Sequence, residues 1–178
     1  CNGAAQLMSR IQVGTLYLPM TALREQSTML QTIVETAREN GTQVRFVREN
    51  LEFPTKRGKI RVLKPDLLES GNDGGLCVLA AHEKYDILIT GDLTAQAEYR
   101  LLSLHTLPQA AVLVAGHHGA ATSTSGALLR AVRPEAVFIS AGADNRFGHP
   151  AAQTLARIRQ SGAAVYRTDL SGTITIRG

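Results

Sequence analysis

The chain has no tryptophan, and aromatic residues make up only 4% of its 178 residues. Its core must therefore be built from Leu, Ile, Val and Ala, and it is poorly supplied with the aromatic platforms on which single-strand binders stack bases. No apolar run approaches the roughly 20 residues that a helix needs to span a bilayer. These absences argue against a membrane-spanning helix within this sequence and against a binder that relies on many stacked bases.

Cysteine is also scarce, and the two thiols, Cys1 and Cys77, provide neither a disulfide framework nor a Cys-x-x-Cys metal pair. Cys77 lies in an apolar run and is predicted to be a small core residue. With 44% hydrophobic and 19% charged residues, the composition is globular and excludes a disordered, collagen-like or coiled-coil chain. Because repeats, low-complexity tracts and linkers are absent, we expect a single domain over residues 1–178.

The net charge of +4 permits a polyanionic partner without requiring one. The basic residues are scattered, apart from the cluster Lys56-Arg57-Gly58-Lys59-Ile60-Arg61. We interpret this cluster as the solvated turn of a hairpin. The chain begins with Cys1-Asn2-Gly3, without an initiator Met or a signal peptide, so we expect it to be a piece of a longer protein.

Strand and helix periods alternate along the chain. Helices are expected at 4–11, 23–40, 95–104, around 128–132 and from 150 to 161, and strands at 13–19, 44–46, 60–63, 76–79, 87–89, 110–114, 136–139, 165–167 and 173–176. The strands at 76–79 and 87–89 should pair as an antiparallel hairpin, and so should the last two strands. A Ser/Thr cap among residues 123–125 should open the helix near 128. This alternation predicts an α/β layered fold.

Three apolar strands run into residues that can bind metal or carry protons. They lead into Thr90-Gly91-Asp92, into Gly116-His117-His118-Gly119, and through a polar loop into Gly148-His149-Pro150. Functional groups of α/β proteins gather at the carboxyl ends of strands. We therefore expect Asp92, the histidine pair and His149 at one edge of the sheet.

Each motif also fits a plainer interpretation. Gly91-Asp92 fits a simple turn or helix cap, one histidine of the adjacent pair fits a structural role, and His149 fits a cap on the following helix. We interpret His82 and His105, which follow no such strand, as surface residues. Asp oxygens and His nitrogens suit Zn²⁺ or Mn²⁺. These ligands are too few for two ions, so either the site holds one ion or further ligands lie outside this chain.

Taken together, the motifs resemble the metallo-β-lactamase-fold domain of the ComEC/ComA competence proteins. The resemblance runs from about residue 60 to the C-terminus and rests on the order and spacing of 88–92, Glu98, 113–119, 139–142, Asn145, 147–150, 165–169 and Gly172. Two positions depart from the family pattern. Ala120 replaces a Ser, and residues 72–76 lack the Ser of an Asn-x-x-Ser-Leu loop.

The resemblance implies an α/β fold that is a partial αββα metallo-β-lactamase-like sandwich. The family's main metal motif is His-x-His-x-Asp-His, and Cys1-Asn2-Gly3 looks like its continuation, so we expect the N-terminal strands of the sandwich to be missing. The resemblance makes Asp92 a bridging carboxylate and implies further metal ligands at His117 and His118. It also implies catalytic residues at His149, Asn145 and Ser140, and phosphate-binding residues at Gly119, Ser123 and Ser125.

The function implied by the resemblance is a metal-dependent hydrolase, a phosphodiesterase or nuclease that acts on DNA during its uptake. We expect two Zn²⁺ or Mn²⁺ ions in the intact domain, one or none in this fragment, no small organic cofactor, and no activity of the fragment alone. The implied partners are DNA and a membrane channel in the same parent chain, with this domain outside the cytoplasm. The alternatives are a stand-alone cytoplasmic hydrolase of another ester or phosphoester, and a catalytically idle DNA-binding or scaffolding domain.

Overall fold

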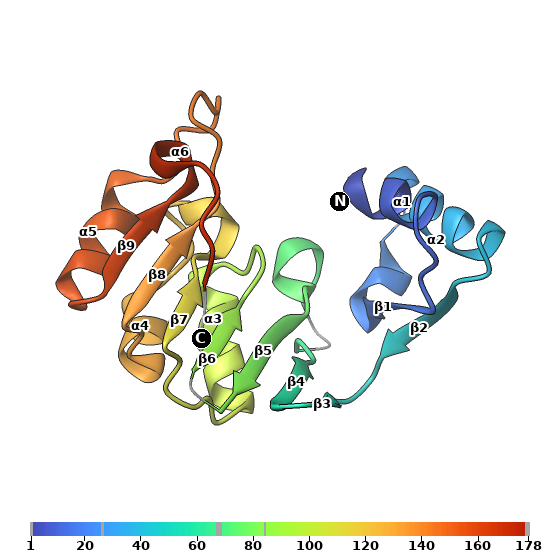
Figure 1. The fold of residues 1–178 in the computed structure, drawn as a ribbon, viewed down its shortest axis with the longest axis horizontal. Coiled ribbons are helices and arrows are strands. Elements are labelled where there is room, and N and C mark those ends of the chain that lie inside the picture. The colour runs from blue at the N-terminus through green and yellow to red at the C-terminus, as the bar shows by residue number, and fades with distance from the viewer. Residues whose placement is uncertain (1, 26, 67–68, 84, 177–178) are drawn as a thin grey trace.

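The computed structural model describes residues 2–25, 27–66, 69–83 and 85–176 (Figure 1). The strands are β1 (Thr15–Pro19), β2 (Gln43–Val47), β3 (Leu51–Thr55), β4 (Gly58–Leu63), β5 (Cys77–His82), β6 (Asp86–Ile89), β7 (Val112–Val114), β8 (Ala136–Ile139) and β9 (Ala164–Arg167). The α-helices are α1 (Asn2–Met8), α2 (Thr28–Glu39), α3 (Ala95–Leu104), α4 (Gly126–Val132), α5 (Ala152–Gln160) and α6 (Thr168–Ser171), and the 3-10 turns are η1 (Met20–Arg24), η2 (Gly71–Gly74) and η3 (Gly116–Gly119).

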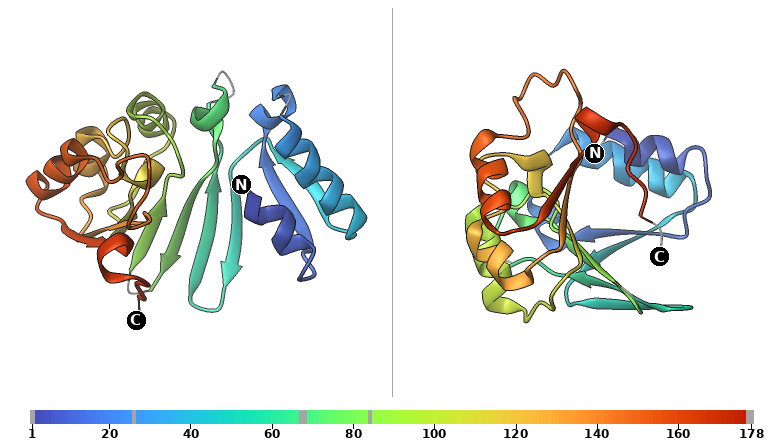
Figure 2. Two further views of the ribbon diagram at one scale, coloured as in Figure 1. Left: turned by 90° about the horizontal axis from the view of Figure 1, so that it is seen from above. Right: turned by 60° about the vertical axis from the view of Figure 1, so that its left-hand side comes forward.

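The large sheet has the strand order β3-β4-β5-β6-β7-β8-β9, and the direction of strand pairing changes at β6. The strands β3 to β6 pair antiparallel, whereas β6 to β9 pair parallel. The helices α3, α4 and α5 each connect one parallel strand to the next. Because such crossovers are almost always right-handed, three crossovers in the same direction place the helices on one face of the sheet, as Figure 2 shows.

The main core lies between this face and its helices. Leu79, Leu88, Leu113 and Val137 form a row of register partners across four strands, and all are buried. They belong to one buried cluster with the helix residues Leu128, Leu129 and Ile158. Burying such a side chain contributes roughly 1.5–3 kcal/mol, so this row fixes the register of the strands. The register in turn fixes where β6, β7 and β8 end.

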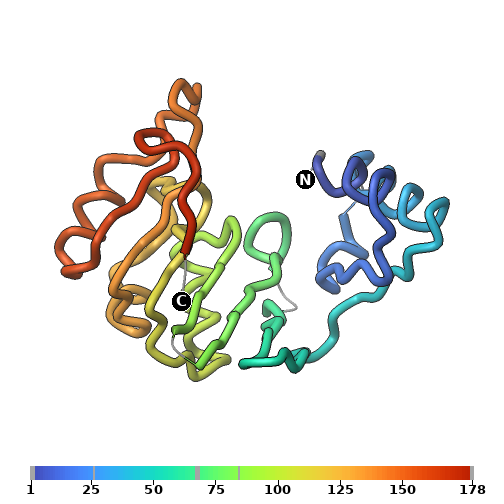
Figure 3. The backbone as a smooth tube through the Cα atoms, in the orientation of Figure 1, coloured from blue at the N-terminus to red at the C-terminus, as the bar shows by residue number. Residues whose placement is uncertain are grey.

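The N-terminal residues form a smaller βαβ unit. The strands β1 and β2 pair parallel, α2 connects them, and α1 packs against α2. The rings of Tyr17 and Phe53 meet edge to face with their centroids 5.4 Å apart. The Thr21 hydroxyl donates to the carbonyl of Gly74 at 2.9 Å. These contacts join the unit to the antiparallel side of the large sheet, beside β3 (Figure 3).

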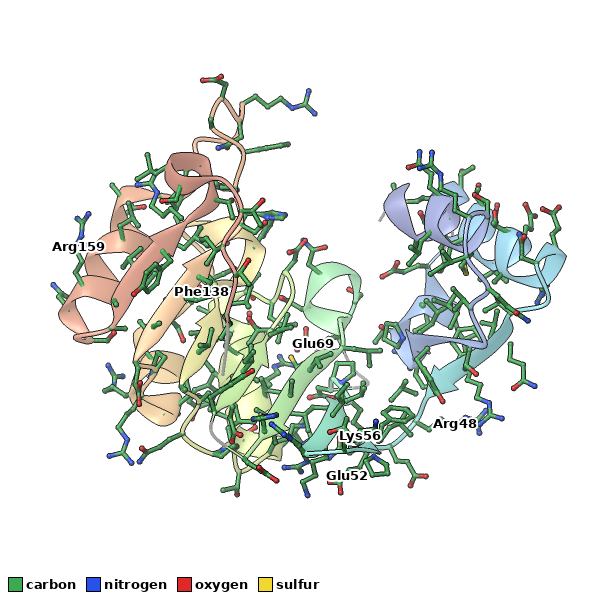
Figure 4. The ribbon with its side chains drawn as sticks, viewed as in Figure 1. Arg48, Glu52, Lys56, Glu69, Phe138 and Arg159 are labelled. Carbon is green, nitrogen blue, oxygen red and sulfur yellow. The ribbon has the colours of Figure 1, made fainter. Side chains whose placement is uncertain are left out.

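The basic cluster forms the turn between β3 and β4, as predicted from the sequence. Thr55 and Gly58 are register partners, so Lys56 and Arg57 make a two-residue turn, and both are exposed. Figure 4 labels Lys56 at this turn, and the polar loop after β8 lies at the opposite edge of the sheet. Lys59 pairs with Glu52 across the hairpin at 3.0 Å, which offsets part of the positive charge.

The α/β fold class is confirmed, and most predicted elements are present. Two predictions about elements are wrong. The helix expected at 23–40 is divided, because η1 ends at Arg24 and α2 begins only at Thr28. The C-terminal hairpin does not form in the described part of the chain. Thr168 begins α6 instead, and its hydroxyl donates to the carbonyl of Ala141 at 2.8 Å, which turns the chain away from β9.

Candidate active site

The candidate site lies at the edge of the large sheet where β6, β7 and β8 end, at the top of Figure 1. Asp92 follows β6, the histidine pair lies in η3 after β7, and His149 lies in the loop after β8. The backbone N–H of His117 donates to the carbonyl of Gly91 at 2.9 Å, which joins the first loop to the second. The fold therefore brings the three predicted motifs to one edge of the sheet.

The histidine pair has a strained backbone. His117 and His118 have φ angles of 49° and 56°. The left-handed region costs roughly 1–2 kcal/mol for a residue with a Cβ, so the fold holds both histidines against their local preference. Nδ1 of His118 lies 2.7 Å from the carbonyl oxygen of Ser140. Because a carbonyl only accepts hydrogen bonds, Nδ1 donates in this contact, which selects the tautomer that has its lone pair on Nε2.

His149 borders a cavity of about 260 Å³, which is lined by His118, Ser140, Ala141, Gly142, Asn145, Phe147 and His149. The His149 ring centroid lies 5.8 Å from that of His117. Nδ1 of His149 is buried and has no hydrogen-bond partner among the described residues. A buried polar atom without a partner costs roughly 1–3 kcal/mol. This nitrogen is therefore a candidate contact for a bound group.

Asn145 holds the loop that carries His149. Its Oδ1 accepts from the backbone N–H of His149 at 3.0 Å, and its Nδ2 donates to the carbonyls of His149 at 2.6 Å and of Gly142 at 2.8 Å. Both amide hydrogens are thus engaged within the loop. Asn145 positions His149 in this structure, and its catalytic role stays a prediction.

A buried carboxylate supports the turn after η3. Glu98 on α3 is fully buried, and its two oxygens accept from the backbone N–H groups of Thr124 at 2.6 Å and Ser125 at 2.7 Å. Burial raises the pKa of the Glu98 carboxyl, while these hydrogen bonds and the charge of Arg157 oppose the rise. Arg157 on α5 donates to two carbonyls of the same turn at 2.8 and 2.9 Å. The turn is therefore held from two helices.

Of the three residues expected to bind phosphate, Gly119 and Ser125 have other contacts in this structure, and the Ser123 hydroxyl has no hydrogen-bond partner among the described residues. Gly119 is buried with φ of 81°, and a Cβ built there would lie 2.8 Å from the Cβ of Pro150. Ser123 is fully buried. The Ser125 hydroxyl accepts from the N–H of Leu128 at 3.2 Å, which confirms the predicted cap of α4. None of the three lines the cavity, so direct contact with phosphate receives no support from this arrangement.

Metal ligands are predicted at Asp92, His117 and His118. Asp92 is exposed, and His117 is half-buried. A zinc site in a protein takes three or four protein ligands. Among the residues that the structure describes, no three His, Cys, Asp or Glu side chains form a group that could hold an ion. The described residues therefore do not fit a complete metal centre by themselves, and the three ligands stay predictions.

The two histidines interpreted as surface residues lie away from the cavity. His82 ends β5 at the opposite edge of the sheet and stacks on Tyr85 with ring centroids 5.0 Å apart. His105 follows α3, and its Nε2 lies 3.1 Å from the carbonyl oxygen of Lys64. Both are only half exposed, because each makes contacts that hold neighbouring segments together.

Two further supports of the site are not predicted from the sequence. Asp73 in η2 accepts from the N–H of Thr94 at 2.8 Å and from its hydroxyl at 3.0 Å, which holds the N-cap residue of α3 two residues after Asp92. Arg157 on α5 holds the turn after η3, although it follows Ala121 of that turn by 36 residues. Their sequence signals, an Asp before Gly-Gly and an Arg on a helix, are ordinary, and only long-range contacts give them a role.

No protein-family model matches the chain. It is 30% identical over 149 residues to ComE operon protein 3 of Bacillus subtilis, which covers 83% of this chain and 19% of that protein. It is 42% identical over 89 residues to competence protein ComA of Neisseria gonorrhoeae, covering 49% and 13% of the two chains. It is 33% identical over 118 residues to recombination protein 2 of Haemophilus influenzae, covering 65% and 15%. The chain thus matches less than a fifth of the length of each relative.

A solved structure, a mutant of CmlA beta-hydroxylase, aligns with a TM-score of 0.51 and 15% identity over 89% of this chain and 38% of that one. At this identity the likeness shows the fold alone, and the fold of that neighbour is the metallo-β-lactamase fold. The relatives and the structural neighbour together confirm the resemblance that the motifs predict.

Proposed function

Because the chain belongs to the ComEC/ComA family of competence proteins and has the metallo-β-lactamase fold, we propose that it hydrolyses phosphodiester bonds of DNA during competence. The names of its relatives refer to competence and to recombination, processes in which a cell handles DNA. A net charge of +4 also suits a polyanionic substrate.

The observation that carries this proposal is a small cavity lined by two imidazoles, with a third imidazole beside one of them. His118 and His149 line it, and the ring centroid of His117 lies 5.8 Å from that of His149. Histidine is the side chain whose ordinary pKa lets it give and take protons near neutral pH. Cleaving a phosphodiester requires proton transfer to the leaving oxygen and contacts for the phosphate oxygens. Positioned acid–base groups typically contribute about 10²–10⁴-fold to the rate.

The hydrogen bonds around His118 and His149 suggest how the imidazoles divide this work. The Ser140 carbonyl fixes the tautomer of His118 with the proton on Nδ1, which leaves the lone pair of Nε2 for a metal ion. Nδ1 of His149, unpartnered among the described residues, can donate to a phosphate or leaving-group oxygen. Asn145 holds His149 in place through its backbone. Ser140 borders the cavity as well, where its hydroxyl can contact the substrate.

We further propose that the activity depends on Zn²⁺ or Mn²⁺, with Asp92, His117 and His118 among the ligands. Such ions supply charge stabilisation and a water molecule that loses its proton readily. Because the described residues do not form a complete centre, the remaining ligands would come from elsewhere in the full-length protein.

We also propose that the chain is the part of a membrane protein that processes DNA outside the cytoplasm, next to a channel in the same protein. Its match to less than a fifth of the length of each relative supports the part of this proposal that places it in a longer protein. Within the described residues, no helix is both long and apolar enough to cross a bilayer.

The proposal is tested by hydrolysis of labelled DNA by the full-length protein, its Asp92→Ala variant and a His82→Ala control. Asp92→Ala should lose at least about 100-fold in rate and bind less metal by elemental analysis, because its carboxylate is a proposed ligand. His82→Ala should keep the wild-type rate, because His82 ends β5 at the opposite edge of the sheet. Equal rates for wild type and Asp92→Ala, or equal losses in both variants, would contradict the proposed site.

A further inference from the structure

We propose that Phe147 is a stacking platform for one nucleobase at the mouth of the active-site cavity, so that the site takes single-stranded or unpaired DNA. The proposal rests on the proposed function, because it names the form of nucleic acid that this site accepts. Phe147 lies in the loop between β8 and α5, at the edge of the sheet that carries the histidines.

Phe147 is placed where hydrophobic packing alone does not explain it. Its exposed fraction is 68%, whereas Phe46, Phe53 and Phe138 are half-buried. In a chain with only four phenylalanines, leaving one ring in solvent forgoes roughly 1.5–3 kcal/mol that its burial would contribute. An exposed aromatic ring beside a cavity is a common feature of sites that bind ligands with flat, apolar faces.

Two planar groups already lie against this ring. The guanidinium carbon of Arg146 lies 5.1 Å from the Phe147 ring centroid. The His149 ring is inclined by only 19° to the Phe147 ring, with centroids 6.0 Å apart. A guanidinium is flat and stacks on aromatic faces as a base does. Because Arg146 is exposed, a base can displace it, and its charge is then free to contact the phosphate next to that base.

The cavity favours one base over a base pair. Its volume of about 260 Å³ is below the roughly 300–1,000 Å³ of pockets for drug-sized ligands. Ala141 and Gly142 leave part of its wall without polar side chains. Within a duplex, the faces of each base are covered by its neighbours, so a base reaches a protein ring only when it is unstacked. A base on Phe147 would place the adjoining phosphate near His149, whose ring lies beside the same platform.

The test is equilibrium binding to full-length protein with its metal in place, using probes whose phosphorothioate linkages resist cleavage. The probes are a short single-stranded oligonucleotide and an abasic oligonucleotide of the same length and charge. Phe147→Ala should bind the normal oligonucleotide roughly 5- to 150-fold more weakly and the abasic one as the wild type does. Phe147→Tyr, which keeps the ring, should bind both as the wild type does. Tyr99→Ala is the matched control, because Tyr99 on α3 is 69% exposed and does not line the cavity.

The outcomes separate this inference from the proposed function. If Phe147→Ala binds both probes equally more weakly, Phe147 supports the fold of the loop. If it binds both as tightly as the wild type, Phe147 does not contact DNA. Either result overturns the stacking platform and leaves DNA binding in place. If the wild type binds neither probe, the proposed function fails and the inference fails with it. A duplex that binds as tightly as the single strand would also overturn the inference.

Discussion

Removing the Glu98 carboxylate is expected to destabilise the turn that supports the histidine loop. In Glu98→Ala the buried N–H of Thr124 and the partly buried N–H of Ser125 lose their acceptors at 2.6 and 2.7 Å. Each unsatisfied donor costs about 1–3 kcal/mol, so the expected loss is about 2–6 kcal/mol. That is a large part of the roughly 5–15 kcal/mol by which a domain is stable.

The same residue predicts a pH dependence of stability. Burial raises the pKa of Glu98 in the folded chain above its ordinary value of 4.5. Between the ordinary pKa and the raised pKa, the folded state keeps the proton of Glu98 while the unfolded state has lost it. The stability that protonated Glu98 contributes is therefore fully present below its ordinary pKa and is lost as the pH rises through the raised pKa. Glu98→Gln is neutral and keeps one acceptor oxygen, so it should lose less stability than Glu98→Ala and should not show this decline.

The assay is urea unfolding of the chain at about pH 5 and about pH 8, with Glu135→Ala as the control because Glu135 is exposed. The wild type should lose more stability between the two pH values than Glu98→Gln does. A Glu98→Ala variant within about 0.5 kcal/mol of the control would refute the reasoning about buried donors. An unchanged pH slope in Glu98→Gln would refute the reasoning about the raised pKa.

Three further predictions concern the same part of the fold. His117→Gly should be about 1 kcal/mol more stable than His117→Ala in urea unfolding, because only glycine adopts the φ of 49° without strain; equal stabilities would show that the backbone is not strained. Gly119→Ala should lose at least about 1 kcal/mol more than Gly162→Ala, because both have φ near 81° but only a Cβ at Gly119 meets Pro150; equal losses would rule out the clash. In a Cys1→Ser background, Cys77 should react with a thiol reagent only as fast as the chain opens, because burial raises its pKa to about 12; rapid labelling of the folded chain would contradict its burial.

The elements that define the site could be predicted because their signals are local. The apolar runs ending before Asp92, His117 and the loop of His149 have strand periodicity, and the rule that functional groups gather at the carboxyl ends of strands places them together. The hairpins of β3–β4 and β5–β6 have short connections and paired β-prone runs, which sequence patterns show directly.

What could not be predicted depends on contacts between distant segments. Thr173 to Ile176 alternate like a strand, but the hydrogen bonds between Thr168 and Ala141 direct the chain into α6 before any pairing can begin. The burial of Ser123 follows from packing in the turn held by Glu98 and Arg157, which a serine near a Gly-His-His motif does not reveal. Local sequence signals therefore predict where the loops lie, whereas contacts between distant segments decide which side chains line the cavity.

The most direct test of the central claim, that the His149 cavity is a phosphodiesterase site, is cleavage of an end-labelled single-stranded oligonucleotide by full-length wild-type protein and its His149→Ala variant. The wild type should cleave, and the variant should keep its bound metal while cleaving about 10²–10⁴-fold more slowly, because it lacks the group placed to transfer the proton. A variant that cleaves at the wild-type rate, or a wild type that does not cleave at all, would contradict the account.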